Sequence, residues 1–74
     1  MNDEYSKAMG QHISAIRQSK GLTQEQLSAK LQVIGCDITR SALAKIEVGQ
    51  RHLYPDELKA LKIVLGIRYD DLFI

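Results

Sequence analysis

The feature that most constrains this chain is a helix-start signal that occurs twice, at Thr23 and at Thr39. A threonine hydroxyl just before a helix accepts a hydrogen bond from a backbone N–H that the helix leaves unpaired. At Thr23 the signal includes Gln26, whose side chain can return the bond in a capping box. Apolar residues frame each threonine in the spacing of a hydrophobic staple, Leu22 with Leu27 and Ile38 with Leu43. We therefore expect two short helices in succession.

The other apolar residues also recur at helical spacings of three and four, and glycines separate the segments. Met9, Ile13 and Ile16 lie on one helix face, and Pro55 suits the first turn of a later helix because its missing N–H is not needed there. Together the patterns predict helices over about residues 5–19, from Thr23 through Leu31, over about 40–48, over about 55–65, and from Tyr69. A connection with a bend at Gly35 is expected over residues 32–38.

A chain of 74 residues has room for one domain, which we expect over residues 1–74 with a core of about 9–73 and with residues 1–4 disordered. The predicted fold class is all-α: a compact domain of five short helices around a leucine and isoleucine core. A chain this short buries only about 60% of its unfolded surface, so the core is one small cluster.

Charge is unevenly distributed along the chain. The net charge is only +1, but residues 13–54 contain six basic and three acidic residues, a pattern that suits a polyanionic partner. The acidic N-terminus, the single Cys36 and the lack of a long apolar run indicate a reducing, cytoplasmic setting with no membrane segment.

No catalytic or metal-binding constellation is visible in the sequence. His12 and His52 are isolated, and Cys36 has no histidine near it in the sequence. We therefore expect a protein that is not an enzyme, with no catalytic residues, no metal, no cofactor and no small-molecule ligand.

Two segments match a known family: Gly-Leu-Thr-Gln-Glu-Gln-Leu-Ser over residues 21–28 and Arg-Ser-Ala-Leu-Ala-Lys-Ile-Glu-Val-Gly-Gln-Arg over 40–51. Leu-Gly-Ile and then Asp-Leu-Phe follow in the expected order near the C-terminus. From about Met9 to Phe73 the chain resembles the Cro and phage-repressor helix-turn-helix family, the xenobiotic-response-element class. The resemblance implies a five-helix, lambda-repressor-like domain of a bacterium or phage that binds operator DNA, with a helix-turn-helix formed by the second and third helices.

The sequence departs from that family in two places. The connection between the second and third helices is about five residues longer than in the shortest members, and Ser28 stands where a small residue, usually alanine, is expected. The small side chain still lets the two helices approach. The longer connection leaves the angle between the helices, and with it the exact base contacts, open.

The third helix is expected to enter the major groove, where each base pair presents a distinct pattern of donors and acceptors. With Leu43 and Ile46 facing inward, a turn of about 100° per residue places the candidate base-contacting residues outward. These are Arg40, Ser41, Ala44 and Lys45. The alternative is that the four residues form an ordinary solvated helix face.

Six residues are candidates for phosphate contacts: Thr23, Gln24, Thr39, Gln50, Arg51 and His52. The threonines and Gln24 lie at helix N-termini, where unpaired N–H groups attract phosphate. The resemblance gives Gln24 the phosphate-contacting role of the family glutamine, although it can also help to cap its helix. The other three follow the third helix and can reach the second DNA strand.

Arg17 and Glu47 match a family pair that forms a structural salt bridge between the first helix and the end of the third. We expect this pair to be buried, with a solvated pair as the alternative.

The function predicted from these features is sequence-specific binding of double-stranded DNA, as a transcriptional repressor. A homodimer through the apolar C-terminal end, Leu72, Phe73 and Ile74, would read a palindromic operator, although Leu72 can instead close the monomer core. The alternative function is a protein-interaction module with the same fold, such as an antitoxin or an adaptor.

Overall fold

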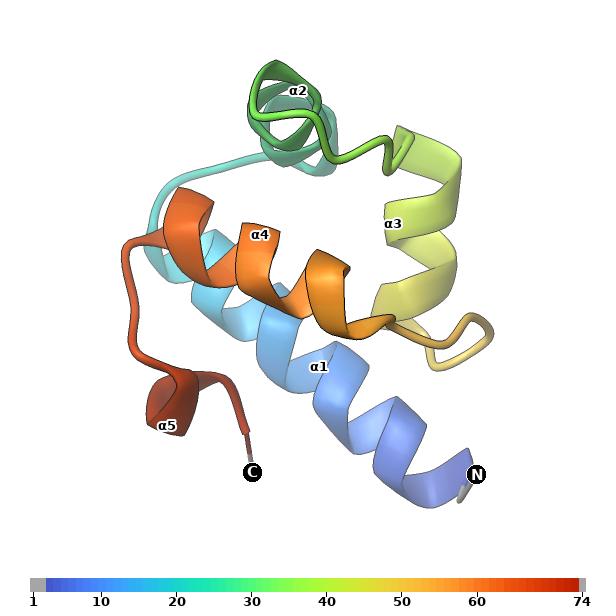
Figure 1. Cartoon of the computed structure of the whole chain (residues 1–74). Helices are drawn as coiled ribbons and strands as arrows, with labels where there is room; N and C mark the ends of the chain where they lie inside the picture. Colours follow the sequence, from blue (N-terminus) through green and yellow to red (C-terminus); the bar gives the residue numbers. More distant parts are fainter. Residues whose placement is uncertain (1–2, 74) are drawn as a thin grey trace.

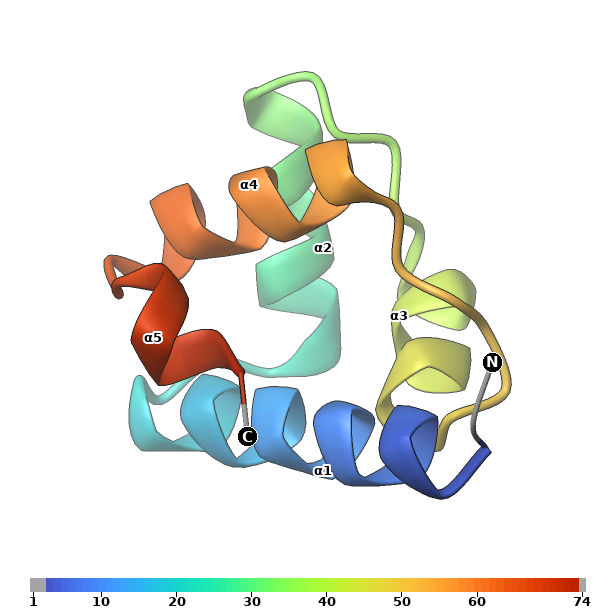
Figure 2. The same ribbon diagram turned by 60° about the horizontal axis from the view of Figure 1, so that its bottom comes forward.

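A computed structural model describes residues 3–73, and every regular element within them is a helix. The helices are α1 (Asp3–Ser19), α2 (Gln24–Val33), α3 (Arg40–Glu47), α4 (Pro55–Leu65) and α5 (Tyr69–Leu72). In Figure 1, α1 and α4 lie one above the other, α2 is at the top, and α3 stands at one end. Figure 2 shows α5 at the end opposite α3. The predicted all-α fold with five helices is confirmed.

Helix bounds differ from the sequence prediction by one or two residues. Helix α1 begins at Asp3, so residues 3 and 4, which we expected to be disordered, lie in its first turn, while residues 1 and 2 lie outside the described part. Helix α2 continues to Val33, and the chain turns back at Gly35, which has a φ of +87°. The Cys36 N–H closes this end by donating to the Leu31 carbonyl oxygen at 2.9 Å. The connection to α3 therefore covers residues 34–39.

The core takes large apolar side chains from all five helices and from the α2–α3 connection. Those that are almost completely buried are Ile13, Leu27, Leu31, Ile38, Leu43, Ile46, Leu61 and Leu72. The helical periodicity of the sequence thus selects the residues that pack inward.

Both threonine caps form as the sequence predicts. Thr23 Oγ1 accepts from the Gln26 N–H at 3.0 Å, and Gln26 Oε1 accepts from the Thr23 N–H at 2.9 Å. Thr39 Oγ1 accepts from the Ala42 N–H at 3.1 Å. The two caps define the first residues of α2 and α3, the elements that present the candidate site.

Helices α1 and α3 come into backbone contact at a buried glycine, Gly10, in the middle of α1. A Cβ atom there would overlap the Ile46 carbonyl oxygen and would lie 2.7 Å from the Glu47 carbonyl oxygen. Glycine is therefore the residue that lets the C-terminal turn of α3 rest directly on α1. None of the helices in residues 3–73 is both long enough and apolar enough to span a bilayer.

Candidate nucleic-acid interface

Helix α3 has an inner face and an outer face, as the periodicity predicts. Leu43, Ile46 and Glu47 are buried against the rest of the domain. On the other side Arg40, Ser41 and Lys45 are exposed and Ala44 is half-buried, so the four candidate base-contacting residues share one accessible surface. This surface offers a guanidinium fork, a hydroxyl, a methyl group and an ammonium group, which are the groups that read base edges in a major groove.

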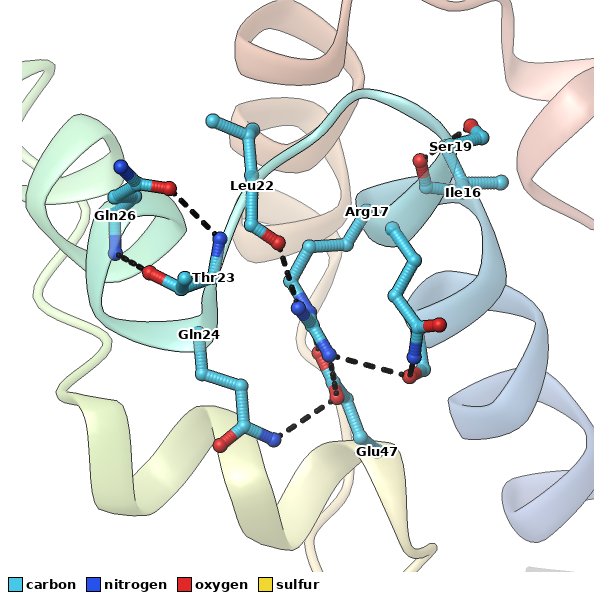
Figure 3. Close-up of polar contacts among 10 residues, drawn as sticks. Ile16, Arg17, Ser19, Leu22, Thr23, Gln24, Gln26 and Glu47 are labelled. Atoms are coloured by element: carbon cyan, nitrogen blue, oxygen red, sulfur yellow. Dashed lines mark hydrogen bonds and ion pairs between the residues drawn. The ribbon is translucent and has the colours of Figure 1, made fainter.

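The buried side of α3 is held from α1 by an arginine–glutamate pair (Figure 3). Arg17 Nε lies 2.8 Å from Glu47 Oε2, and Arg17 Nη2 donates to Glu47 Oε1 at 3.1 Å. Arg17 Nη1 also donates to the Leu22 carbonyl oxygen at 2.7 Å. The side chains are only 10% and 5% exposed, so the pair is buried. It joins α1, the chain entering α2, and the end of α3.

Gln24 connects the first turn of α2 to the same carboxylate. Its Nε2 donates to Glu47 Oε1 at 3.0 Å, in a half-buried position. Burial by itself raises the pKa of Glu47, but hydrogen bonds from Arg17 and Gln24 and the positive charge of Arg17 outweigh it and hold the pKa below its ordinary value. Glu47 therefore stays ionised. It holds α1, through Arg17, and α2, through Gln24, against the end of α3.

The six candidate phosphate-contacting residues fall into two groups. Thr23, Gln24 and Thr39 lie at the starts of α2 and α3, and both threonine hydroxyls already accept bonds from their own helices. Gln50, Arg51 and His52 follow α3, and Gln50 and His52 are exposed. The Gln24–Glu47 bond brings the start of α2 next to the end of α3, the end that the second group follows, whereas Thr39 lies at the start of α3.

Arg51 has a partner that sequence reasoning missed. Its Nη1 donates to Glu57 Oε1 at 3.0 Å and its Nη2 lies 2.9 Å from Glu57 Oε2, in a two-pronged pair with α4. Glu57 Oε1 also accepts from the Tyr54 N–H at 3.0 Å. The hydrogen bond from Arg51 lowers the pKa of Glu57 against the opposing effect of burial. The signal that was available is the place of Glu57 in the first turn after Pro55, where a carboxylate can cap its own helix.

Neither His12 nor Cys36, the residues considered above for catalysis or metal binding, has the surroundings of a reactive site. His12 Nε2 lies 2.6 Å from the Asp71 carbonyl oxygen and connects α1 to α5. Burial, reinforced by nearby Glu57 and Asp56, raises the pKa of the Cys36 thiol and so disfavours a reactive thiolate. Among the residues that the structure describes, no three histidine, cysteine or acidic side chains are grouped so that they could hold a metal ion.

Comparison with known proteins agrees with this geometry. A helix-turn-helix family profile matches residues 13–72. The restriction-modification controller protein C.AhdI from Aeromonas hydrophila is similar in structure, with a TM-score of 0.85, 28% sequence identity, and 96% of each chain covered. The DNA-binding domain of BldD is also similar, with a TM-score of 0.85, 26% identity and 100% of each chain covered. No curated protein sequence matches the chain.

Proposed function

The chain belongs to the Cro/C1-type helix-turn-helix family, whose domains bind DNA and regulate transcription, and on that premise we propose that it is a sequence-specific repressor. In this proposal α3 is the recognition helix and enters the major groove N-terminus first. One observation carries the proposal: the exposed polar face of α3 stands on a buried face that is anchored by Leu43, Ile46 and Glu47. A helix held in this way presents its side chains in one geometry, as base reading requires.

Arg40 is the proposed main reader, because its planar fork can pair with O6 and N7 of guanine. Ser41 is proposed to bond a base edge or a phosphate, Ala44 to contact a thymine methyl group, and Lys45 to reach a base or a phosphate. Arg40, Ser41 and Lys45 are exposed, which supports these roles.

The phosphate contacts are proposed to flank the recognition helix. Unpaired N–H groups at the starts of α2 and α3, next to Thr23, Gln24 and Thr39, attract a phosphate on one strand. Gln50, Arg51 and His52 are proposed to contact the other strand. Contacts of this kind orient the protein on the duplex without reading sequence.

We further propose that the protein acts in the cytoplasm of a bacterium or of an infected bacterial cell, as a homodimer on a palindromic operator. Phe73 is 46% exposed at the C-terminal end, which supports a pairing surface there, whereas Leu72 is buried in the monomer core. Ile74, which we also expected at this surface, lies outside the described residues. Two recognition helices in such a dimer need a separation of about 34–36 Å to read successive turns of the major groove.

Selection of bound duplexes from random DNA tests the proposal, followed by fluorescence anisotropy against the selected duplex and a scrambled one at several salt concentrations. We expect a symmetric consensus and an affinity that falls steeply as salt rises, because phosphate contacts release bound cations. Absence of duplex binding even at low salt would contradict the proposal and favour the protein-interaction alternative.

Two substitutions separate the proposed roles in the same assay. Arg40→Ala should weaken binding to the selected site by about 1–3 kcal/mol and relax the preference at one base pair. Gln24→Ala should weaken binding to all duplexes alike, because phosphates carry no sequence information. Unchanged affinity of Arg40→Ala, or an altered sequence preference of Gln24→Ala, would show that the roles are wrongly assigned.

A further inference from the structure

A polar cluster with one exposed member, which we name the α2–α3 joint, holds the connection that leads into α3. It consists of Ser28, Gln32 and the backbone of Ile38. Ser28 Oγ donates to the Ile38 carbonyl oxygen at 2.7 Å, and Ser28 is only 4% exposed. Gln32 Nε2 contacts both acceptors, Ser28 Oγ at 3.2 Å and the Ile38 oxygen at 3.4 Å. A single hydroxyl on α2 is thus the main tether of the Ile38 carbonyl.

The Ile38 carbonyl lies directly before the residue that caps α3. It belongs to the same planar peptide unit as the N–H of Thr39, the residue that caps α3. The Ile38 side chain is completely buried, so this peptide unit is held through its side chain and through its oxygen. Arg40 is the next residue after the cap. The bond to Ser28 therefore holds the peptide unit that directly precedes the cap of α3.

The Ser28 bond is the tether to α2 of the second half of the α2–α3 connection. The first half of the connection is bonded back to α2, where the Gly35 N–H donates to the Gln32 carbonyl oxygen at 3.0 Å and the Cys36 N–H to the Leu31 carbonyl oxygen at 2.9 Å. The second half runs from Asp37 to Thr39, and the Ser28 bond ties it to α2. A longer connection gives the helix that follows it more freedom of approach, and each tether removes part of that freedom.

From this geometry we propose that Ser28 is a positioning residue for sequence reading: it aims the N-terminal turn of α3, and Arg40 in particular, at the base edges. The inference rests on the proposed DNA-binding function. A two-pronged contact between arginine and guanine is sensitive to distance and angle, so a small displacement of α3 weakens it. Charge attraction to phosphates falls off gradually with distance and tolerates the same displacement.

Ser28→Ala tests this inference, because it removes one oxygen atom and leaves a residue of small volume. We expect affinity for the selected duplex to fall about tenfold, the discrimination that one well-made two-pronged contact supplies. Affinity for a scrambled duplex should stay nearly unchanged. The matched control is Ser19→Ala, which removes a hydroxyl bonded to the Ile16 carbonyl oxygen at the end of α1, outside the joint. This control should bind both duplexes as the parent does.

A double-mutant cycle with Arg40→Ala distinguishes an effect of Ser28 on the position of Arg40 from a general loss of rigidity in the domain. If Ser28 acts by aiming Arg40, the two losses at the selected site are strongly non-additive, and Ser28→Ala costs little once Arg40 is absent. Gln32→Ala provides a second variant should Ser28→Ala not fold. It removes only the longer bonds of an exposed side chain and should shift the ratio of selected to scrambled affinity in the same direction by a smaller factor.

The outcomes keep the two proposals apart. A parent protein that does not discriminate between the duplexes overturns the proposed function. A parent that discriminates, with Ser28→Ala and Gln32→Ala showing the same ratio as the parent, overturns the positioning role alone. Equal losses on both duplexes, or additive losses in the cycle, also overturn it, because they indicate a purely structural effect.

Discussion

The two arginine–glutamate pairs among the described residues have similar hydrogen-bond distances but different surroundings. Each brings two guanidinium nitrogens to within 3.1 Å of the two carboxylate oxygens. In the Arg17–Glu47 pair the side chains are 10% and 5% exposed, and in the Arg51–Glu57 pair they are 29% and 11% exposed. The first pair joins α1 to α3 across the core, whereas the second joins a loop to the helix that follows it.

The difference in exposure gives the two arginine–glutamate pairs different roles. A buried pair is costly to break, because removing one partner leaves an uncompensated charge away from water. A pair that water reaches is worth less, because solvent screens the charges and can replace either partner. We therefore expect the Arg17–Glu47 pair to govern stability, and the Arg51–Glu57 pair to govern how readily Arg51 reaches a phosphate.

The largest effect is expected for Glu47→Ala. This variant leaves Arg17 buried without its carboxylate and also removes the acceptor of Gln24, and it should lower the free energy of unfolding by about 3–5 kcal/mol. Urea denaturation followed by circular dichroism measures the change. Glu25→Ala, which removes an exposed glutamate from α2, is the control and should have little effect. A similar small change in both variants would show that the pair is not buried in solution.

Acid should weaken both pairs. The pKa values of Glu47 and Glu57 are lowered in the folded protein, so the unfolded chain binds protons on these groups at a higher pH than the native state does. Their contribution to stability is therefore complete above about pH 4.5, the ordinary glutamate value, and is lost as the pH falls through the lowered values. Urea midpoints between pH 7 and pH 3 measure it, and Glu47→Gln should flatten the profile more than Glu57→Gln.

A smaller change in stability, about 1 kcal/mol, is expected for Glu57→Gln, because water can solvate the released guanidinium. The effect of Glu57→Gln that tests the role of Arg51 is on the salt dependence of DNA binding. If Arg51 contacts a phosphate, its release from Glu57 should steepen the dependence of log affinity on log salt by about one. Asp56→Asn makes the same change of charge at the neighbouring exposed residue without releasing Arg51. Equal slopes for the two variants would argue against a phosphate role for Arg51.

The smallest effect is expected for Arg68→Ala, at a third ion pair. Arg68 Nε lies 3.5 Å from Asp71 Oδ2, and the side chains are 80% and 46% exposed. The Arg68 backbone N–H also donates to Asp71 Oδ2 at 3.1 Å, and the substitution leaves this capping bond in place. The urea midpoint should therefore match that of the parent. A clear loss of stability would mean that exposure is a poor guide to the strength of these pairs.

Much of the helical framework could be predicted because its signals are local. The hydroxyls of Thr23 and Thr39 bond to N–H groups three residues ahead, and Gly35 supplies a turn that few other residues adopt. The exposed face of α3 followed from the inward positions of Leu43 and Ile46, since helical geometry places their neighbours outside. The Arg17–Glu47 contact joins residues that lie 30 positions apart, and it was expected only because the residues match those of a known family.

Other contacts of the site joined residues that no local rule connects. The Ser28–Ile38 bond, the Gln24–Glu47 bond and the Arg51–Glu57 pair were all missed. In each case one partner had an acceptable interpretation of another kind: Ser28 as a small packing residue, Gln24 as a cap or phosphate contact, and Arg51 as a phosphate contact. Which partner each one meets depends on the relative placement of helices.

The amino-acid sequence alone determined where α2, α3 and α4 begin and which helix faces turn inward, because caps, glycine turns and apolar spacing act over a few residues. Only the tertiary structure decided the partners of Arg51 and Gln24, and the tether of α3 through Ser28. Such bonds form or fail over a few tenths of an ångström, and their lengths are determined by how the packed helices sit against one another.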